Sequence, residues 1–396
     1  MTKKITVFLF ALFIANMAFA QSVKFSGYIQ SQYQYGEKDA ALKVGTSNEN
    51  PEESFNRLGI RRGRFKLTAT DGKLASGVFQ VDVTEKGVGF KDAYLNLKDP
   101  WFNTIQLRAG IFDRPFGNEI SYSSSRRESP ERSTLFQTLF PEERDLGAML
   151  VLQPAKTSVW NILKLEAGLF AGNGIKQETD SRKDFIGHLS LAKTVGNAFS
   201  YGLGASYYNG GVYQGSEKVY TLNDKKFVLD ENETNKGGFA KREYVGFDFQ
   251  VAIASSLGIT QLRAEYLFGQ QPGLSGSSKS PNAAALPAAD TYIRNFSGAY
   301  AVFVQDLGAL PLSAVVKYDF YDPNSEVSGD EIGKEGTSKT DLSFNTLGLG
   351  VLWKISNAFR LQAFYEINKN ETSAHVAGRN EDLKDNVFTL RLQYKF

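Results

Sequence analysis

The strongest constraint in this sequence is an alternation of apolar and polar residues with a period of two, which recurs along the chain and runs to its last residue. In the final stretch, one set of residues is Phe388, Leu390, Leu392, Tyr394 and Phe396, and the other is Thr389, Arg391, Gln393 and Lys395. Successive side chains of a β-strand point to opposite faces of the sheet, so each set occupies one face. The pattern predicts an all-β protein whose strands each have an apolar and a polar face.

The polar faces of these predicted strands carry charged residues. Arg263 and Glu265, for example, lie opposite Leu262, Ala264 and Tyr266. A dry protein core does not tolerate such charges, whereas a water-filled lumen does. The alternation therefore favours a transmembrane β-barrel, with lipid outside and water inside, over a soluble β-sandwich.

The connections between the predicted strands also alternate in length. Seven short turns, such as Ser255–Gly258, separate eight longer polar loops, which predicts a sixteen-stranded antiparallel barrel with both chain ends on the turn side. A barrel of this size leaves an aqueous channel. The third loop, Gly117–Asp145, is unusually long.

The first twenty residues have the three-part layout of a secretory signal peptide. Lys3 and Lys4 supply the positive start, Ile5–Met17 is a short apolar run, and Ala18-Phe19-Ala20 is a small-x-small cleavage site. We expect cleavage after Ala20, so that residues 1–20 are the signal peptide and residues 21–396 are the barrel. The chain contains no cysteine, which excludes disulfides and thiolate metal sites.

Motifs between Phe55 and Asp145 resemble the phosphate-selective porins of the O and P type. They are the basic cluster Arg57, Arg61, Arg62, Arg64 and Lys66, then Phe90-Lys91-Asp92-Ala93-Tyr94-Leu95, Leu107-Arg108-Ala109-Gly110, Pro115-Phe116-Gly117, Glu131-Arg132-Ser133 and Arg144-Asp145-Leu146-Gly147. The resemblance implies a homotrimeric porin in the outer membrane of a Gram-negative bacterium, surrounded by lipid, that passes small hydrophilic solutes. It also implies lumenal arginines and lysines that favour anions such as phosphate, and a third loop folded inward as a constriction. The strand ending on Phe396 resembles the signal by which the barrel assembly machinery recognises its clients.

Nine basic residues are the predicted lining of the lumen and its constriction. They are Arg62, Arg64, Lys66, Arg108, Arg114, Arg126, Arg127, Arg132 and Arg144. Guanidinium groups suit this role because they are permanently charged and bind oxyanions with two donors. The third loop also carries the acids Glu128, Glu131, Glu142, Glu143 and Asp145. An alternative for Arg132 and Arg144 is therefore that they pair with these acids and fix the loop to the wall. An alternative for Arg62, Arg64 and Lys66 is that they form an ordinary solvent-exposed face without a role in selectivity.

Three other classes of outer-membrane protein are alternatives to a diffusion pore. An outer-membrane enzyme needs a nucleophile and base on an accessible face, but His188 falls on the inner face of its strand. An energised receptor needs about 22 strands and a plug domain. A structural or adhesive barrel closed by its own loops stays an alternative. We expect no enzymatic activity, no metal or cofactor and no nucleic-acid partner.

Overall fold

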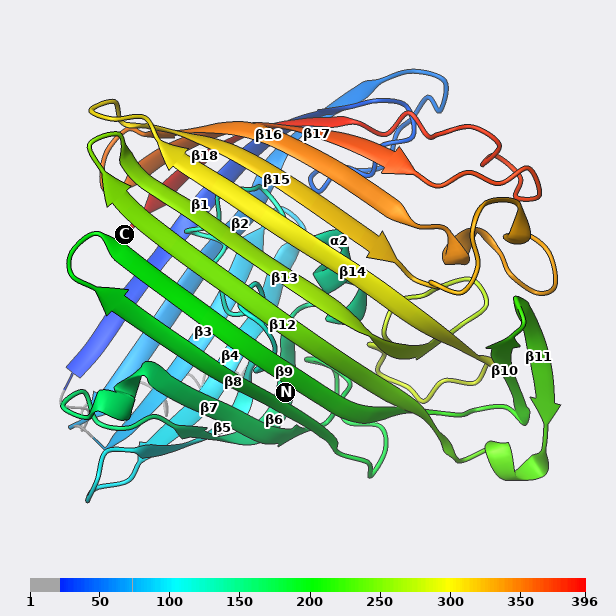
Figure 1. The fold of residues 1–396 in the computed structure, drawn as a ribbon, viewed down its shortest axis with the longest axis horizontal. Helices are drawn as coiled ribbons and strands as arrows, with labels where there is room; N and C mark the ends of the chain where they lie inside the picture. The colour runs from blue at the N-terminus through cyan, green and yellow to red at the C-terminus, as the bar shows by residue number, and fades with distance from the viewer. Residues whose placement is uncertain (1–21, 73) are drawn as a thin grey trace, which may run out of the picture.

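The structure is a computed structural model that describes residues 22–72 and 74–396. The predicted signal peptide lies outside the described residues, so its cleavage stays a prediction. Sixteen strands form a closed antiparallel barrel (Figure 1), as the sequence predicts. They are β1 (Ser22–Gly36), β2 (Phe55–Asp71), β3 (Ala75–Thr84), β4 (Gly87–Lys98), β5 (Ile105–Asp113), β6 (Arg144–Leu152), β7 (Leu163–Phe170), β8 (Asp184–Val195), β9 (Phe199–Tyr213), β12 (Phe239–Ser255), β13 (Gly258–Gly273), β14 (Thr291–Asp306), β15 (Leu312–Asp322), β16 (Phe344–Lys354), β17 (Phe359–Asn370) and β18 (Val387–Lys395).

The barrel closes where its first strand pairs with its last. β1 and β18 are antiparallel neighbours, with Tyr28 opposite Lys395 and Gly36 opposite Val387. The alternation in the sequence becomes an alternation in exposure: Thr389 and Arg391 are 0% and 1% exposed, whereas Leu390 is 37% exposed. The exposed apolar set therefore forms the outer surface, which is the face a barrel presents to lipid.

The remaining elements are not part of the wall. β10 (Lys218–Asn223) and β11 (Lys226–Glu231) form a hairpin within the loop between β9 and β12, and β10 pairs in parallel with the start of β14. The short helices are α2 (Thr134–Leu139), η1 (Val159–Ile162), η2 (Glu233–Asn235), η3 (Gly329–Glu331) and η4 (Lys339–Asp341). None of the helices in the described residues is long and apolar enough to cross a membrane.

Two irregularities in strand register interrupt the alternation. Between β1 and β2, Gln30 pairs with Arg62 and Ser31 pairs with Ile60, so Arg61 has no partner on β1. Such a β-bulge inserts one extra residue and re-aims its side chain. A strict period of two would turn Arg61 away from Arg62 and toward hydrocarbon, where a charged side chain costs about 2–4 kcal/mol near mid-membrane. The bulge instead points both Arg61 and Arg62 into the barrel. Their shared contact shows this, since both side chains bind the interior residue Glu131.

The second irregularity lies between β3 and β4. Gln80 pairs with Asp92 and Val81 pairs with Phe90, which leaves Lys91 without a partner on β3. Lys91 borders an interior cavity together with Arg61 and Arg62. Each register shift therefore adds one basic side chain to the inner face of the wall.

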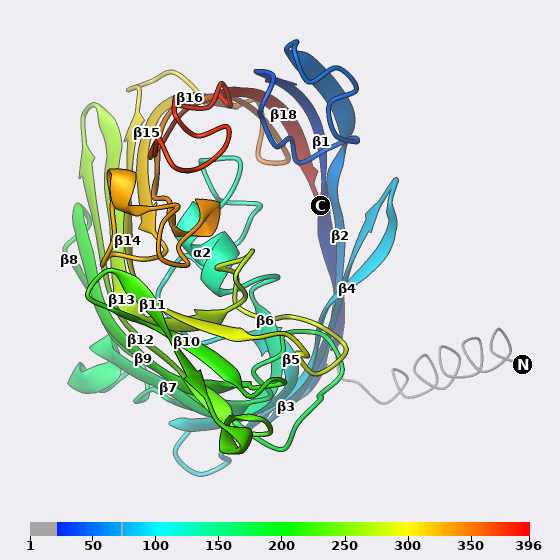
Figure 2. The same ribbon diagram turned by 90° about the vertical axis from the view of Figure 1, so that its right-hand side faces the viewer.

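The third loop, residues 114–143, lies inside the ring of strands. Figure 2 looks along the barrel and shows α2 within the lumen. One side of the loop packs against the wall through buried aromatic rings, among them Phe136 and Phe140 from α2 and its end, and Tyr208, Tyr244 and Tyr300 from β9, β12 and β14. One side of the barrel interior is therefore filled by an apolar core.

Candidate functional site in the lumen

The third loop leaves the wall at a glycine that fits tightly against β13. Gly117 has a φ of +60°, and a Cβ atom there would lie 2.0 Å from Glu265 Oε2. The next two backbone N–H groups, of Asn118 and Glu119, donate to the Glu265 carboxylate at 3.1 and 2.6 Å. The N–H of Thr134 likewise donates to Asp319 of β15 at 2.8 Å. Wall carboxylates therefore hold both the start of the loop and the start of α2.

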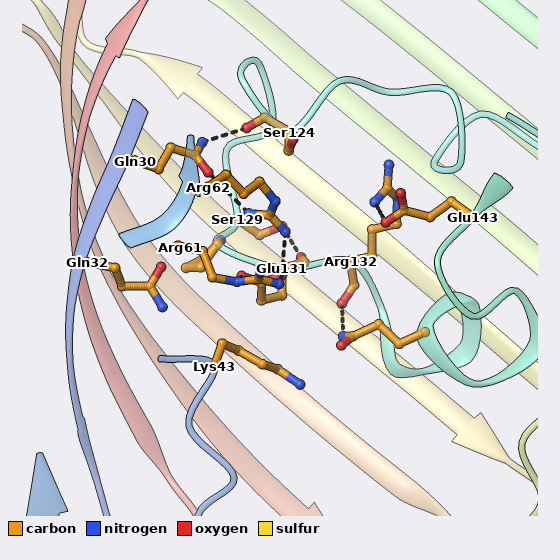
Figure 3. Close-up of polar contacts among 12 residues, drawn as sticks. Gln30, Gln32, Lys43, Arg61, Arg62, Ser124, Ser129, Glu131, Arg132 and Glu143 are labelled. Carbon is orange, nitrogen blue, oxygen red and sulfur yellow. Dashed lines mark hydrogen bonds and ion pairs between the residues drawn. The ribbon is translucent and has the colours of Figure 1, made fainter. Parts of the chain in front are cut away.

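On the other side of the lumen, Glu131 ties the loop to the wall (Figure 3). Its carboxylate accepts hydrogen bonds from Arg61 at 2.8 Å, from Arg62 at 2.9 Å and from Arg391 of β18 at 2.8 Å. Burial raises the pKa of Glu131, but attraction to the three guanidinium groups outweighs it and holds this pKa well below its usual value. The loop thus crosses the lumen and is held by backbone hydrogen bonds to wall carboxyl groups on one side and by the Glu131 ion pairs on the other.

Most of the predicted lining residues are engaged in ion pairs. Arg64 donates to both oxygens of Asp82 at 2.6 Å. Arg144 binds Asp92 at 2.9 Å and Asp113 at 3.1 Å, and both it and Arg132 pair with Glu143. The expected pairing of Arg132 and Arg144 with acids is therefore what the structure contains.

Arg127 differs from these arginines. It is 3% exposed, and none of its three guanidinium nitrogens has a hydrogen-bond partner in the described part of the chain. Burial, together with repulsion from Arg132 and Arg62, lowers the pKa of Arg127 to about 9, so the group is still charged at neutral pH. A buried guanidinium without a partner is costly, which makes Arg127 the charge in the loop that most needs a counter-ion.

Three cavities that share lining residues border the loop. The central one, about 270 Å³, has six basic and four acidic residues in its lining, including Arg61, Lys91, Arg127 and Glu131. A cavity of about 410 Å³ on the turn side has eight basic and two acidic residues. One of about 340 Å³ on the loop side has three basic and five acidic residues. Arg132 borders all three cavities.

The nine predicted lining residues are placed as follows. Arg62, Arg64 and Lys66 of β2 and Arg108 of β5 border the central or the turn-side cavity, and Arg108 donates to Asn96 at 2.9 Å. Arg126, Arg127 and Arg132 lie in the third loop and border the cavities. Two expected positions need correction. The loop runs from 114 to 143, so Arg114 belongs to the loop rather than to the wall, and Arg144 is the first residue of β6.

Arg114 needs a further correction. It is 1% exposed, and its Nε lies 3.1 Å from Asp145, so it presents no surface to the cavities. Reasoning from the sequence missed three basic residues, Arg61, Lys91 and Arg391. Arg391 shares the predicted polar face of the last strand with Thr389 and Gln393, whereas the inward placement of Arg61 and Lys91 depends on the two bulges. A change of phase within the basic cluster, from odd-numbered Arg57 and Arg61 to even-numbered Arg62, Arg64 and Lys66, was the available signal.

No model of a known protein family matches the chain, and no curated protein matches it in sequence. Comparison with solved structures does find similar proteins. Pseudomonas putida OprB has a TM-score of 0.58 over 94% of each chain, at 11% sequence identity. The fold is that of an outer-membrane porin. Salmonella typhi OmpF, solved with daunomycin, has a TM-score of 0.57 over 94% of this chain and 97% of its own, at 11% identity.

A third similar structure is a porin of Rh. blastica, with a TM-score of 0.53 over 95% of this chain and all of the other, again at 11% identity. The porin fold accounts for the wall and for its apolar outer band, which is the surface expected in the outer membrane of a Gram-negative bacterium. At these identities the likeness extends to the fold alone, so the chemistry of the lumen has to be argued from the residues of this chain.

Proposed function

We propose that the protein is an outer-membrane porin for passive diffusion of small hydrophilic solutes, with a preference for anions such as phosphate. The observation that carries the proposal is the excess of basic groups in two of the three cavities, eight against two on the turn side and six against four at the centre. Fixed positive charge along a narrow aqueous path raises the local concentration of anions and lowers that of cations.

Arg127 adds to this argument. The other arginines of the central cavity are largely neutralised by Glu131, Asp82 and Glu143, whereas Arg127 has no acidic partner among the described residues. An anion passing through the central cavity would supply that partner. The resemblance to phosphate-selective porins points to phosphate, and the structure of the lumen supports small anions in general.

The proposal includes three further parts. Residues 1–20 are a signal peptide and residues 21–396 form the mature barrel. Phe396 is the residue that the barrel assembly machinery recognises. The protein is a homotrimer; one similar structure, OmpT of Vibrio cholerae, is described as a trimer form.

The test is the reversal potential of purified protein in a planar bilayer under a KCl gradient. The proposal predicts discrete conductance steps and a reversal potential that favours chloride, more strongly at low salt, where the Debye length is longer. Replacing chloride by phosphate then measures the preference between the two anions. A reversal potential that favours potassium would contradict the anion preference.

A second candidate is a structural barrel closed by its own loops. It is favoured by the anchoring of the third loop at both sides of the lumen and by the small volume of the central cavity. The same bilayer experiment separates the two candidates, because a closed barrel inserts into the membrane without producing conductance steps.

A further inference from the structure

Lys91 reaches the lumen through a local exception to the strand pattern. On either side of it, Phe90 pairs with Val81 and Asp92 pairs with Gln80. The ring of Phe90 lies against Phe79 at 5.7 Å, and Phe79 is one of the exposed apolar residues of the outer surface. Asp92 is buried in the interior, where it accepts a hydrogen bond from Arg144. Lys91, the extra residue between them, borders the central cavity.

The surroundings of Lys91 distinguish it from Arg61, the other residue that a bulge delivers to this cavity. Both Nε and a terminal nitrogen of Arg61 are bound to Glu131 at 2.8 Å. The ammonium group of Lys91 has no ion pair or side-chain hydrogen bond within residues 22–72 and 74–396, although acids and bases of the cavity, Glu143, Arg144, Arg64 and Asp82, act on it through space. Its charge therefore stays available to a solute in the cavity.

We propose that Lys91 is a selectivity-determining residue, placed in the solute path by the β-bulge of β4. The inference rests on the proposed anion preference and deepens it. A lysine suits this role because its ammonium is a compact charge on a flexible stem, which can follow a passing anion without holding it in one geometry. The arginines bound to Glu131 instead set the position of the third loop.

The absence of cysteine from the sequence makes a direct test possible. In the full-length protein, Lys91→Cys removes the charge and introduces a single thiol. We expect the chloride-to-potassium permeability ratio in dilute KCl to fall by about two- to threefold, the effect of a change in local potential of about half of one kT per unit charge, because the potential acts on the two ions in opposite directions. Aminoethyl methanethiosulfonate, which rebuilds an ammonium at the end of a lysine-like chain, should restore the ratio. The sulfonatoethyl reagent, which adds a negative charge, should lower it further.

Two matched variants come from the same pair of strands. Lys86→Cys, in the exposed connection between β3 and β4, should react with both reagents and leave the permeability ratio unchanged. Phe90→Cys, on the outer face, should not react with the charged reagents once the barrel is in lipid. Folding of each variant is checked by the heat-dependent mobility of the assembled barrel in detergent gels.

The outcomes distinguish this inference from the proposed function. Suppose that the wild-type channel prefers chloride, but that Lys91→Cys keeps the wild-type permeability ratio and neither reagent changes it. Lys91 then does not lie in the path of the ions, and the inference is wrong. If the wild-type channel shows no preference for chloride, the proposed anion preference itself fails, and this inference fails with it.

Discussion

Phe396 and Gly27 exchange two backbone hydrogen bonds, each 3.0 Å long, across the seam between β18 and β1. The ring of Phe396 lies 5.7 Å from that of Phe25 and 6.0 Å from that of Phe65. A Cβ atom at position 27 would lie 2.7 Å from the Phe396 ring, so Gly27 leaves the space that this ring occupies.

Removal of Phe396 is therefore expected to prevent assembly. It deletes both hydrogen bonds at the end of the seam and the ring that covers it on the outer face, and it removes the proposed recognition residue. Phe396→Ala keeps the backbone bonds and should assemble in reduced amount. The measurement is the quantity of heat-modifiable barrel in outer-membrane fractions. Normal levels of the truncated protein would show that neither the seam contacts nor recognition depend on this residue.

Arg64 and Asp82 allow the effect of charge on selectivity to be separated from the effect of pore shape. The two residues form an ion pair with two hydrogen bonds of 2.6 Å. Arg64→Gln leaves Asp82 unpaired and should shift the permeability ratio toward cations. It should also destabilise the barrel, by up to about 3–5 kcal/mol where an unpaired charge stays buried. The double variant with Asp82→Asn removes both charges, so its reversal potential should return close to that of the wild type. If the double variant keeps the shift of the single one, the effect comes from a change of shape and not of charge.

Arg127 allows a more direct test of whether lumenal charge sets the ion selectivity. Unlike Arg64, it pairs with no acid in the described part of the chain, so its removal leaves no acid without a partner. Changing Arg126 and Arg127 together to Gln should reduce the preference for anions by about two- to threefold, without a loss of stability. The matched control is Lys334→Gln with Lys339→Gln, two exposed lysines of the loop between β15 and β16, which should have a small effect. Equal effects of the two pairs on reversal potential would mean that the third loop is not the constriction.

The lowered pKa of Glu131 leads to a prediction of how the third loop responds to acid. Its pKa is depressed in the folded protein, so its contribution to stability is present above the usual pKa of 4.5 and is lost as the pH falls through the depressed value. Acidification from neutral pH to about pH 4.5 should therefore leave the loop tethered. Glu131→Gln should release it at any pH, because Arg61, Arg62 and Arg391 lose their shared carboxylate. Open-channel current noise reports this mobility; a rise in noise of the wild type already near pH 5 would contradict the assignment.

The wall could be predicted from sequence because lipid imposes a simple rule on every strand. Leu390 and Thr389 are adjacent, and their opposite exposure follows from a period of two alone. The strand number followed from the alternation of short and long connections. The bulges at Arg61 and Lys91 could not be predicted in this way, since each depends on the register of two paired strands and not on one strand by itself.

The site was harder to predict than the wall because its contacts join distant parts of the chain. Glu131 and Arg391 are 260 residues apart in sequence and 2.8 Å apart in space. The composition of the third loop showed that arginines and acids occur together there. It did not show that Glu131 serves three arginines while Arg127 has no partner, because that distribution depends on how the loop crosses the lumen.

The lining charges change sign along the three cavities, from an acidic excess on the loop side to a basic excess on the turn side. Two adjoining zones of opposite fixed charge act on mobile ions as a diode. When the loop side is positive, cations enter through the acidic zone and anions through the basic zone, so carriers accumulate where the zones meet; the opposite polarity depletes them. A pore of this kind passes more current in one direction than in the other, and the asymmetry fades as salt shortens the Debye length from about 10 Å at 0.1 M to about 3 Å at 1 M.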